Sequence, residues 1–441
     1  MEPAAPSEVD ALVEHLFRHS AGRMVSSLAR RLGSARLDLA EEAVQDALVR
    51  ALHTWPYGGV PREPRAWLFQ VAKHRALDLL RREASLRGKL EIIEGEPGPV
   101  VNLDAADDRA VGDDELAMMF MCCHPSLPSL GRIALTLKTV GGFSVEEIAA
   151  AFLAEPAAIA QRLVRAKRQI REQDIPIEIP QSDEVAGRLE SVLDVLYLFF
   201  NEGYSVHGGE NLVRAELCGE AIRLAGILAG NRRTDLPLVH ALLALMLLQA
   251  SRLPARVDEA GDLLLLSEQD RARWDQGLIA EGLRHLERAS SGESMTAYHV
   301  EAAIAACHAV APDEASTNWT YVLRLYGELL SLKPSPVVEL NRAIALAMVE
   351  GPTAGIRAIE GIQEHPVLAR YYLLPAALGA LCLRAGDARR AADYYREALT
   401  RPSSTPERRF LEKQLERCAP SRGQVSQSNI KLPRDRGSDQ V

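Results

Sequence analysis

The stretch RAWLFQVAKHRALDLLRR, from Arg65 to Arg82, decides the fold predicted for the first part of the chain. Its apolar residues recur with the 3.6-residue period of an α-helix, and neither Gly nor Pro interrupts it. Pro64 stands just before it, where proline is tolerated. From Val60 to Lys89 there are eight Lys or Arg against three Asp or Glu, a net charge of +5 in a chain whose formal charge is -9. A positive patch on an acidic protein favours phosphate contact, so the stretch predicts an amphipathic helix that binds DNA.

Composition sets the fold class. At 441 residues the chain is too long for one ordinary domain, so two or three are expected. Hydrophobic residues make up 47% and aromatic residues 5%, and continuous runs of Val, Ile and Thr are scarce, which favours an all-α architecture. No secretory segment is recognisable, and the longest apolar run, His240 to Gln249, looks too short to cross a bilayer. We therefore expect a cytoplasmic protein with no membrane partner.

The six cysteines lack CxxC spacing and mostly fall within apolar helical patterns, so buried reduced thiols are expected. The one cluster that could suggest a metal site consists of Cys122, Cys123 and His124. Adjacent cysteines followed by His form a poor tetrahedral set, and no second ligand pair is nearby. The sequence predicts no catalytic residue, no metal and no cofactor.

Two further helical segments precede the basic stretch. Apolar spacing from Glu8 to Leu32 predicts one or two helices of a small bundle. The next helix begins with Asp38 as the predicted N-cap and has acids in its first turn. Its side chains expected to pack inward are Leu48, Leu52 and Trp55, and those expected outside are Glu41, Glu42, Gln45 and Asp46.

A second DNA-binding pattern follows an acidic segment. Between Leu90 and Glu115 nine acids stand against one base with little periodicity, which predicts a linker. Ser144 and Glu147 then have the spacing of a capping box, and after a short turn a basic helix is expected from Pro156 to Glu172. Its expected inward residues are Ile159, Leu163, Ala166 and Ile170, and its expected outward residues are Gln161, Arg162, Arg165, Lys167, Arg168 and Arg171. This order is typical of a helix-turn-helix whose second helix enters the major groove.

The C-terminal half is helical and acidic. Residues 174 to 441 carry 29 basic and 36 acidic side chains, so this half is not a further DNA-binding surface. Pro334, Pro366 and Pro402 lie 32 and 36 residues apart, a period that suggests tetratricopeptide (TPR)-like repeats. In the clearest repeat, Gly386-Asp387 is the expected turn and Tyr394 is expected to pack back on the helix pair. An irregular bundle is the alternative for residues 186 to 310.

Three groups of residues carry a family resemblance. Arg65-Ala66-Trp67-Leu68, Val71-Ala72-Lys73-His74 and Arg81-Arg82 resemble the helix of extracytoplasmic-function (ECF) sigma factors that recognises the promoter -10 element. The helix after Pro156 resembles their last region, which recognises the -35 element. The aromatic stretch from Leu196 to Tyr204 resembles the start of a TPR-like extension in one group of these factors. For the first helix alone, a solvated basic helix of another helical protein is the alternative.

The resemblance implies an all-α chain in five parts. These are a sigma-2 domain that binds core polymerase and the -10 element (8-89), an acidic flexible linker (90-114), a sigma-4 helix-turn-helix domain that binds the -35 element (115-174), a helical TPR-like extension (183-418) and a disordered tail (419-441). The implied polymerase contacts are Glu41, Glu42, Gln45 and Asp46. The implied -10 contacts are Tyr57, Arg65, Trp67, Lys73, His74, Arg75, Arg81 and Arg82. The implied -35 contacts are Gln161, Arg162, Arg165, Lys167, Arg168 and Arg171.

The function implied is that of a sigma factor, which is not an enzyme. It binds the clamp of the largest subunit and the flap of the second largest subunit of core RNA polymerase, recognises promoter DNA and melts the -10 region. The extension is expected to regulate activity in cis and to offer a surface for a protein partner. A helix-turn-helix regulator or a TPR scaffold, neither itself a sigma factor, is the alternative. The separate helix with Gln45-Asp46 argues against both.

Overall fold

The computed structural model describes residues 6–90, 111–152, 154–204, 215–259, 262–292, 294–401 and 405–419. Packing divides the chain into two units, Met1–Ser335 with Ser404–Pro406, and Pro336–Ser403 with Glu407–Val441. The described residues are helical except for connecting segments and one isolated β-bridge, between Val257 and Leu263. The predicted all-α class is therefore confirmed. Most of the predicted linker, the predicted tail beyond Ala419, and Pro402 lie outside the described residues.

The helices of the first unit are α1 (Pro6–Leu32), η1 (Ser34–Arg36), α2 (Leu37–Gly58), α3 (Pro64–Leu90), α4 (Val111–Cys122), α5 (Ser129–Thr139), α6 (Val145–Ala151), α7 (Pro156–Glu172), α8 (Ser182–Tyr204), α9 (Ala215–Gly230), α10 (Pro237–Ala250), η3 (Leu253–Ala255), η4 (Arg271–Arg273), α11 (Gln276–Ala289), α12 (Ala297–Val310) and α13 (Trp319–Leu332). Those of the second unit are α14 (Pro336–Glu350), α15 (Pro352–Glu360), η5 (Pro366–Leu368), α16 (Leu373–Arg384), α17 (Ala388–Leu399) and α18 (Thr405–Arg417).

Helix α2 corrects two details of the sequence prediction. Its N-cap is Arg36, so Asp38 lies in the first turn instead of at the cap, where its charge still meets the positive end of the helix. Leu48 and Trp55 are buried as expected, but Leu52 is exposed. The buried stripe passes through Ala51, and the next residue is rotated by about 100° away from it on a helix with 3.6 residues per turn.

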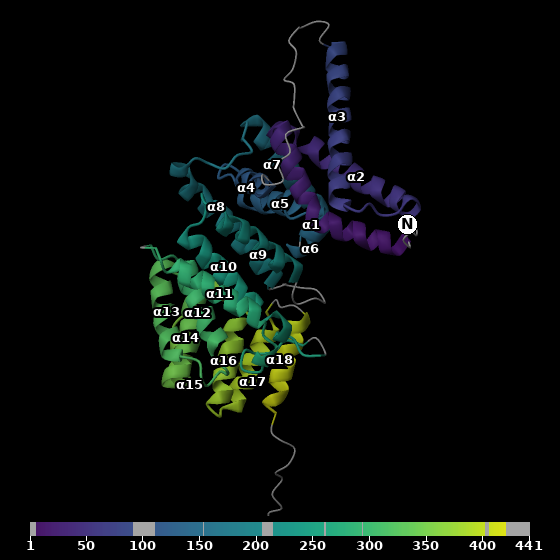
Figure 1. Cartoon of the computed structure of the whole chain (residues 1–441). Helices are drawn as coiled ribbons and strands as arrows, with labels where there is room; N and C mark the ends of the chain where they lie inside the picture. The colour runs from purple at the N-terminus through teal and green to yellow at the C-terminus, as the bar shows by residue number, and fades with distance from the viewer. Residues whose placement is uncertain are drawn as a thin grey trace, which may run out of the picture. The chain divides into compact units, whose positions relative to one another are not determined.

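Helix α4 is the centre of the first unit. Every described residue from Asp114 to Cys123 is buried, including a run of Met and Phe side chains. It packs against α1 on one side and against α8 and α9 on the other (Figure 1). One hydrophobic cluster runs from Val9 to Ala302, so the N-terminal helices and the first helices of the extension share a core.

The helix-turn-helix forms as the sequence predicts. The backbone N–H of Glu147 donates to Ser144 Oγ at 3.1 Å, and the Ser144 N–H donates to Glu147 Oε2 at 2.8 Å, which completes the capping box at the start of α6. Helix α7 has the predicted bounds. The four residues expected to face inward are all buried, namely Ile159, Leu163, Ala166 and Ile170.

Helix α10 is apolar on all sides and packs against α9, α11 and α12. Together with the turn that follows it, the stretch Pro237–Ala255 is by length and composition alone sufficient to cross a membrane, and it extends beyond the run His240 to Gln249 considered in the sequence. Within the fold, 72% of its most apolar window is buried by protein.

The second unit is built of helix pairs. Gly386 ends α16 with a φ of 86°, and Asp387 Oδ1 accepts from the Arg390 N–H at 3.0 Å to start α17, which confirms the predicted turn. The aromatic ring that packs on the pair belongs to Tyr395 and not to Tyr394, because a Cβ at Gly379 would lie 3.0 Å from that ring. The TPR-like repeat itself stays a prediction.

Candidate polymerase and nucleic-acid interfaces

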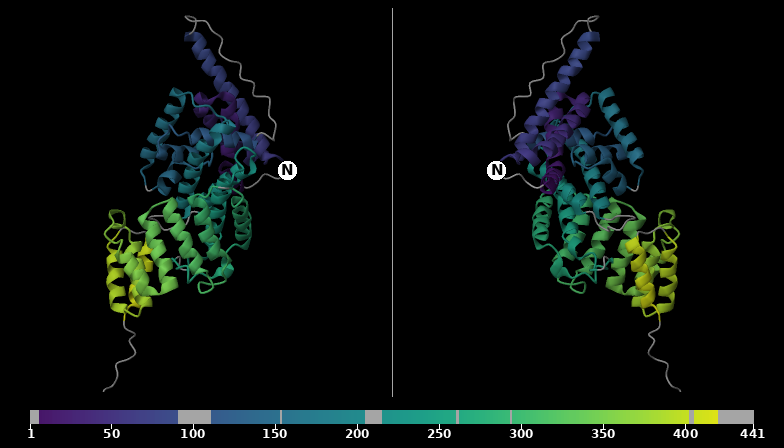
Figure 2. Two further views of the ribbon diagram at one scale, coloured as in Figure 1. Left: turned by 90° about the vertical axis from the view of Figure 1, so that its left-hand side faces the viewer. Right: turned by 90° about the vertical axis from the view of Figure 1, so that its right-hand side faces the viewer.

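Helix α3 presents the predicted -10 side chains on two faces. Arg65, His74, Arg81 and Arg82 are exposed, and Figure 2 shows α3 extending beyond the neighbouring helices of this unit. Trp67 is half-buried, and its ring lies 5.4 Å from that of Trp55, so it also holds α3 on α2. Lys73 is half-buried as well. The exposed subset is therefore the part of α3 that is open to a partner in this structure.

Tyr57 is the most exposed large apolar side chain among the described residues of this region. It lies at the end of α2, with 89% of its surface exposed, directly before the turn at Gly59, whose φ is 78°. An aromatic ring in that position is available to stack on an unpaired base.

Arg75 ties the predicted -10 helix to the predicted polymerase helix. Its Nε pairs with Asp46 Oδ2, and its Nη2 lies 3.7 Å from Glu42 Oε1. Only 29% of the Arg75 side chain is exposed. Arg75 therefore holds two helices together, and Asp46 carries an internal contact in addition to any external one.

The outer face of α2 combines polar and apolar groups. Glu42 and Gln45 are exposed on it, together with Val49 and Leu52, both exposed apolar side chains. Docking surfaces commonly have an apolar centre inside a polar rim. The sequence analysis missed Val49 because it described the outer face of this helix by its acidic residues alone. The position of Val49 in the helical period, away from the buried stripe, already places its side chain outside.

The outward face of α7 carries Gln161, Arg165, Arg168 and Arg171, all exposed, whereas Arg162 is half-buried. Val164 stands among them with 64% of its surface exposed. The sequence analysis passed over this residue, which a helical wheel places on the same face as Gln161 and Arg168. Among the described residues, no acidic side chain pairs with Arg165.

Lys167 lies on a different edge of α7 from the one predicted. Its Nζ lies 2.8 Å from Asp38 Oδ1 and 2.7 Å from Glu41 Oε2, and only 15% of its side chain is exposed. Burial alone would lower the pKa of Lys167, but the Glu41 carboxylate and the hydrogen bond that Lys167 donates to Asp38 outweigh it and raise the pKa above its ordinary value. The expectation of an exposed Lys167 was wrong for this conformation, and its role at the -35 element stays a prediction.

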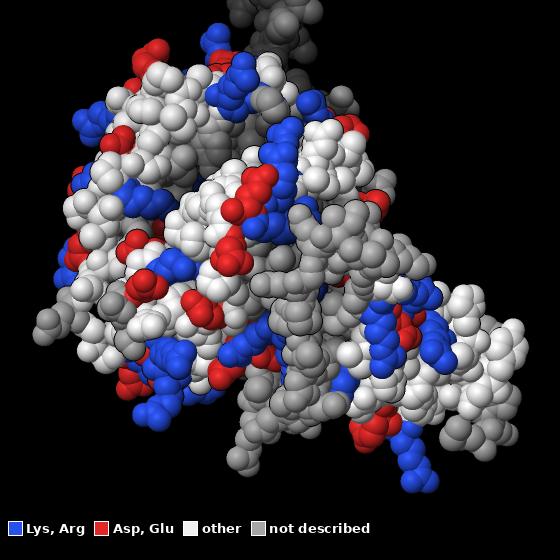
Figure 3. Space-filling view, turned by 90° about the horizontal axis from the view of Figure 1, so that it is seen from above, with Lys and Arg blue, Asp and Glu red and all other residues white. Residues whose placement is uncertain are grey.

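On the face seen in Figure 3, basic and acidic side chains lie next to one another and do not gather in one field of a single sign. This agrees with a formal net charge of -9 over 441 residues. The locally basic faces of α3 and α7 are the ones predicted to contact phosphate.

The cysteine cluster is part of the core. Cys122 and Cys123 are buried, and burial raises the pKa of both thiols, that of Cys123 to about 11. Cys123 Sγ lies 3.4 Å from Thr136 Oγ1. Over the part of the chain that the structure describes, no group of three or more His, Cys, Asp or Glu side chains is arranged to hold a metal ion.

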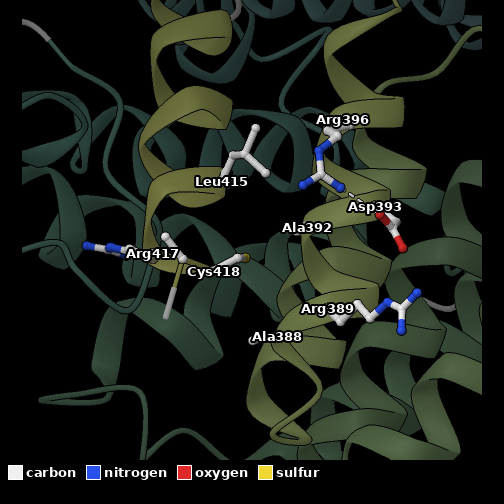
Figure 4. A pocket seen from close by; sticks show the side chains of 9 residues that line it. Ala388, Arg389, Ala392, Asp393, Arg396, Leu415, Arg417 and Cys418 are labelled. Atoms are coloured by element: carbon white, nitrogen blue, oxygen red, sulfur yellow. Dashed lines mark hydrogen bonds and ion pairs between the residues drawn. The ribbon is translucent and has the colours of Figure 1, made fainter. Parts of the chain in front are cut away.

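A surface hollow of about 840 Å³ lies in the second unit, between α17 and the end of α18. Arg389, Arg396 and Arg417 are among its lining residues (Figure 4). Arg396 Nη1 pairs with Asp393 at 2.6 Å, and the guanidinium groups of Arg389 and Arg417 point away from each other. The hollow thus lacks the convergent polar groups of a small-molecule site.

Three known protein families match separate parts of the chain. Residues 17–86 match the family described as Sigma-70 region 2, and residues 117–170 match Sigma-70, region 4. Residues 188–290 match a family of unknown function, DUF6596. No solved structure matches the chain.

Three curated proteins are similar to this chain over alignments of different length. An uncharacterized protein, R00370, of Rhizobium meliloti is 39% identical over 87% of this chain and 90% of its own length. The ECF RNA polymerase sigma factor SigJ of Mycobacterium tuberculosis is 33% identical over 42% of this chain, and SigE of Mycolicibacterium smegmatis is 27% identical over 36%. The aligned regions cover 57% of SigJ and 60% of SigE.

Proposed function

Because the chain belongs to the ECF sigma factors of the sigma-70 family, we propose that it recruits core RNA polymerase to its promoters through α2, α3 and α7, under the control of its own C-terminal extension. A sigma factor binds core polymerase and promoter DNA and initiates transcription without bond chemistry of its own. We expect it to act in the cytoplasm.

The observation that carries the proposal is the placement of three separate partner faces on one unit. The outer face of α2 holds Gln45 and Glu42 around exposed apolar side chains. The face of α3 holds exposed basic groups beside the exposed ring of Tyr57, and α7 holds the exposed Arg165. One protein face and two DNA faces are what a factor that bridges polymerase and promoter requires.

Each of the three faces has its own proposed partner. The α2 face fits the clamp of the largest polymerase subunit, with Glu42, Gln45 and Asp46 as its polar contacts. Helix α3 and Tyr57 fit the -10 element, where the exposed ring stacks on an unpaired base. In α7, Arg165 and Gln161 contact base edges, and the other exposed arginines hold phosphates. The sigma-4 helices are proposed to meet the flap of the second largest subunit.

Substitution of Asp46 tests polymerase docking. Its ion pair with Arg75 allows an internal role of Asp46 to be separated from an external one. Asp46→Arg breaks the pair with Arg75 and reverses a charge on the docking face, and we expect it to weaken core-polymerase binding by about 2–5 kcal/mol. The double variant Asp46→Arg with Arg75→Asp restores the internal pair in reverse but not the external charge. Binding that stays weak in the double variant supports docking, whereas full recovery shows that Asp46 only holds α3 in place.

The extension has a positive role in this proposal. Its helices α8 and α9 complete the core around α4, which itself supports the helix-turn-helix. The second unit, from Pro336, is the part free to regulate, because its removal leaves that core intact. We expect the fragment 1–335 to direct less promoter-specific transcription than the full chain. Equal transcription and equal affinities would assign the helix pairs to an external protein partner instead.

A further inference from the structure

Four polar side chains form a hydrogen-bonded relay where α10 packs on α11, within the segment that matches the family of unknown function. Arg288 Nη2 donates to Asp235 Oδ1 at 2.8 Å and to Asp235 Oδ2 at 3.0 Å. Asp235 Oδ1 lies 2.7 Å from His240 Nε2, and His240 Nδ1 lies 2.8 Å from His285 Nδ1. Asp235 precedes α10, His240 lies in its first turn, and the other two residues lie on α11. The relay therefore leads from a guanidinium through a carboxylate to two imidazoles.

The contact between the two imidazoles is a hydrogen bond and not a stack. Their ring centroids lie 4.9 Å apart with 21° between the ring planes, but the two Nδ1 atoms are 2.8 Å apart. Atoms of stacked rings in van der Waals contact lie about 3.5 Å apart, whereas 2.8 Å is a hydrogen-bond distance. One Nδ1 atom therefore donates a proton to the other.

The partners of each ring nitrogen decide which one donates. The hydrogen bond from His240, with Arg288 nearby, holds the pKa of Asp235 below its ordinary value, so that the carboxylate is ionised and can only accept. His240 Nε2 therefore carries a proton. Since Asp235 and Arg288 already balance each other's charge, the enclosed His240, with 3% of its side chain exposed, is neutral. Its Nδ1 then accepts from His285 Nδ1–H, which leaves the lone pair of His285 on Nε2.

The Nε2 atom of His285 reaches the surface, whereas the ring of His240 is enclosed. His285 is half-buried, and its Nε2 is not among the sealed polar atoms without a partner, as the Nε2 of His299 is. Burial, with His240 and two arginines nearby, lowers the pKa of His285 to about 4, so that this imidazole is neutral at pH 7. A neutral imidazole whose free lone pair faces outward can act as a nucleophile.

Two arginines flank His285 on α11. Arg284 precedes it in the sequence, Arg288 follows it by three residues, and the positive charge of both acts on its imidazole. Arg284 is exposed, and so is 51% of the Arg288 side chain. Guanidinium groups form strong, charge-assisted hydrogen bonds to phosphoryl oxygens. A group attached to His285 Nε2 would therefore meet positive charge, which favours a phosphoryl group.

We propose that His285 is a phosphoryl acceptor, that Asp235 and His240 position it, and that the donor is a phosphoramidate, in which phosphorus is bonded to nitrogen. The lone pair of His285 Nε2 attacks the phosphorus, a new N–P bond forms, and the P–N bond of the donor breaks. The donor nitrogen, already fully protonated, leaves as the free amine, and nothing is oxidised or reduced. The imidazolium that forms keeps its Nδ1 proton, bonded to His240, and Asp235 stabilises its charge through the relay. The site lies in the extension and does not depend on the proposed sigma-factor function.

Labelling of the purified full chain with potassium phosphoramidate at pH 7 tests the proposal. Mass spectrometry of its peptides, kept at neutral or alkaline pH, measures the labelling rate at each histidine. We expect His285 to be labelled on the order of tenfold faster than the exposed His53. Asp235→Asn keeps the shape of the side chain but removes its charge, and it should abolish most of this advantage. The matched control is Asp393→Asn, which changes another exposed aspartate that pairs with an arginine and should leave the rate at His285 unchanged.

Nitrogen-15 NMR of the chain labelled at histidine gives a second readout, with His285→Gln to identify the signals of His285. We expect its proton on Nδ1 in the parent, and a weaker preference for that position in Asp235→Asn. Labelling of His285 no faster than that of His53, in a parent chain with intact melting, overturns the acceptor role. A proton on His285 Nε2, or fast labelling that survives Asp235→Asn undiminished, overturns the positioning role of the relay. Polymerase takes no part in these measurements, so either failure leaves the proposed function standing.

Discussion

At the scale of single residues, what each charged side chain touches decides which predicted role it can fill. The family resemblance implies DNA contacts for Lys167 and Arg75, yet both pair with carboxylates of α2. Helical periodicity places a residue on a face but does not say which other helix covers that face. Arg165 and Arg168, by contrast, remain exposed as predicted.

The exposed arginines of α7 give the first residue-level prediction. If Arg165 contacts a base edge, Arg165→Ala should cost about 1–3 kcal/mol and relax discrimination at one position of the -35 element. Arg168 already pairs with Glu172 at 3.4 Å and should hold phosphate, so Arg168→Ala should weaken all promoter variants alike. Affinities measured over a panel of single-base variants check this, and the reverse pattern means that the two roles are exchanged.

At the scale of helices, local sequence signals worked where the contacts are local. The capping box of α6, the bounds of α7 and the turn at Gly386-Asp387 all depend on residues within a few positions of one another. The exposure of Leu52 and the choice between Tyr394 and Tyr395 depend on the phase of packing against another helix. A single sequence leaves the choice between two adjacent residues for the buried position open. Both wrong predictions differ from the structure by that one position.

The packing of α12 on α13 predicts that the stability of the fold depends on pH. Burial, with Arg252 and Arg271 nearby, lowers the pKa of His308 to about 4, and its ring packs edge-on against Trp319. In the unfolded chain a histidine titrates near 6.5, so unfolding takes up a proton once the pH falls below that value. His285, whose pKa burial also lowers to about 4, acts in the same direction.

The chain should therefore lose stability as the pH falls from about 6.5 to about 4, with this contribution constant above 6.5. His308→Gln should flatten the dependence of the melting temperature on pH across that window. The exposed His53→Gln serves as the matched control and should leave the slope unchanged. A parent chain whose melting temperature rises on acidification in this range would contradict the assignment.

At the scale of the whole molecule, the division of the chain is not the one that sequence motifs suggest. The sequence predicts a boundary between the helix-turn-helix domain (115-174) and the extension (183-418), but the core continues through α8 and α9 to Ala302. The helix-turn-helix motif does not reveal this, because it specifies only local contacts. A helix buried on two sides shows instead as one that is apolar all round. The buried run of Met and Phe in α4 was the available signal.

We predict that the fragment 1–180 does not fold stably, whereas 1–335 does. Removing α8 and α9 exposes apolar side chains of α4, each worth about 1.5–3 kcal/mol of burial, against a typical total stability of 5–15 kcal/mol. It also leaves Glu115 without Arg223. Thermal unfolding followed by circular dichroism checks both fragments. Cooperative melting of 1–180 at the temperature of 1–335 would show that the extension is dispensable for the core.

The most direct test of the whole account is transcription of genomic DNA from the organism that encodes the chain, with its purified core polymerase and sequencing of the transcript 5′ ends. The account predicts that the full chain creates new, discrete 5′ ends that share sequence elements near -10 and -35, and that Arg165→Ala changes which of them are used. Tight binding to DNA with no start sites beyond those of core polymerase alone would contradict it and make the chain a DNA-binding protein that is not a sigma factor.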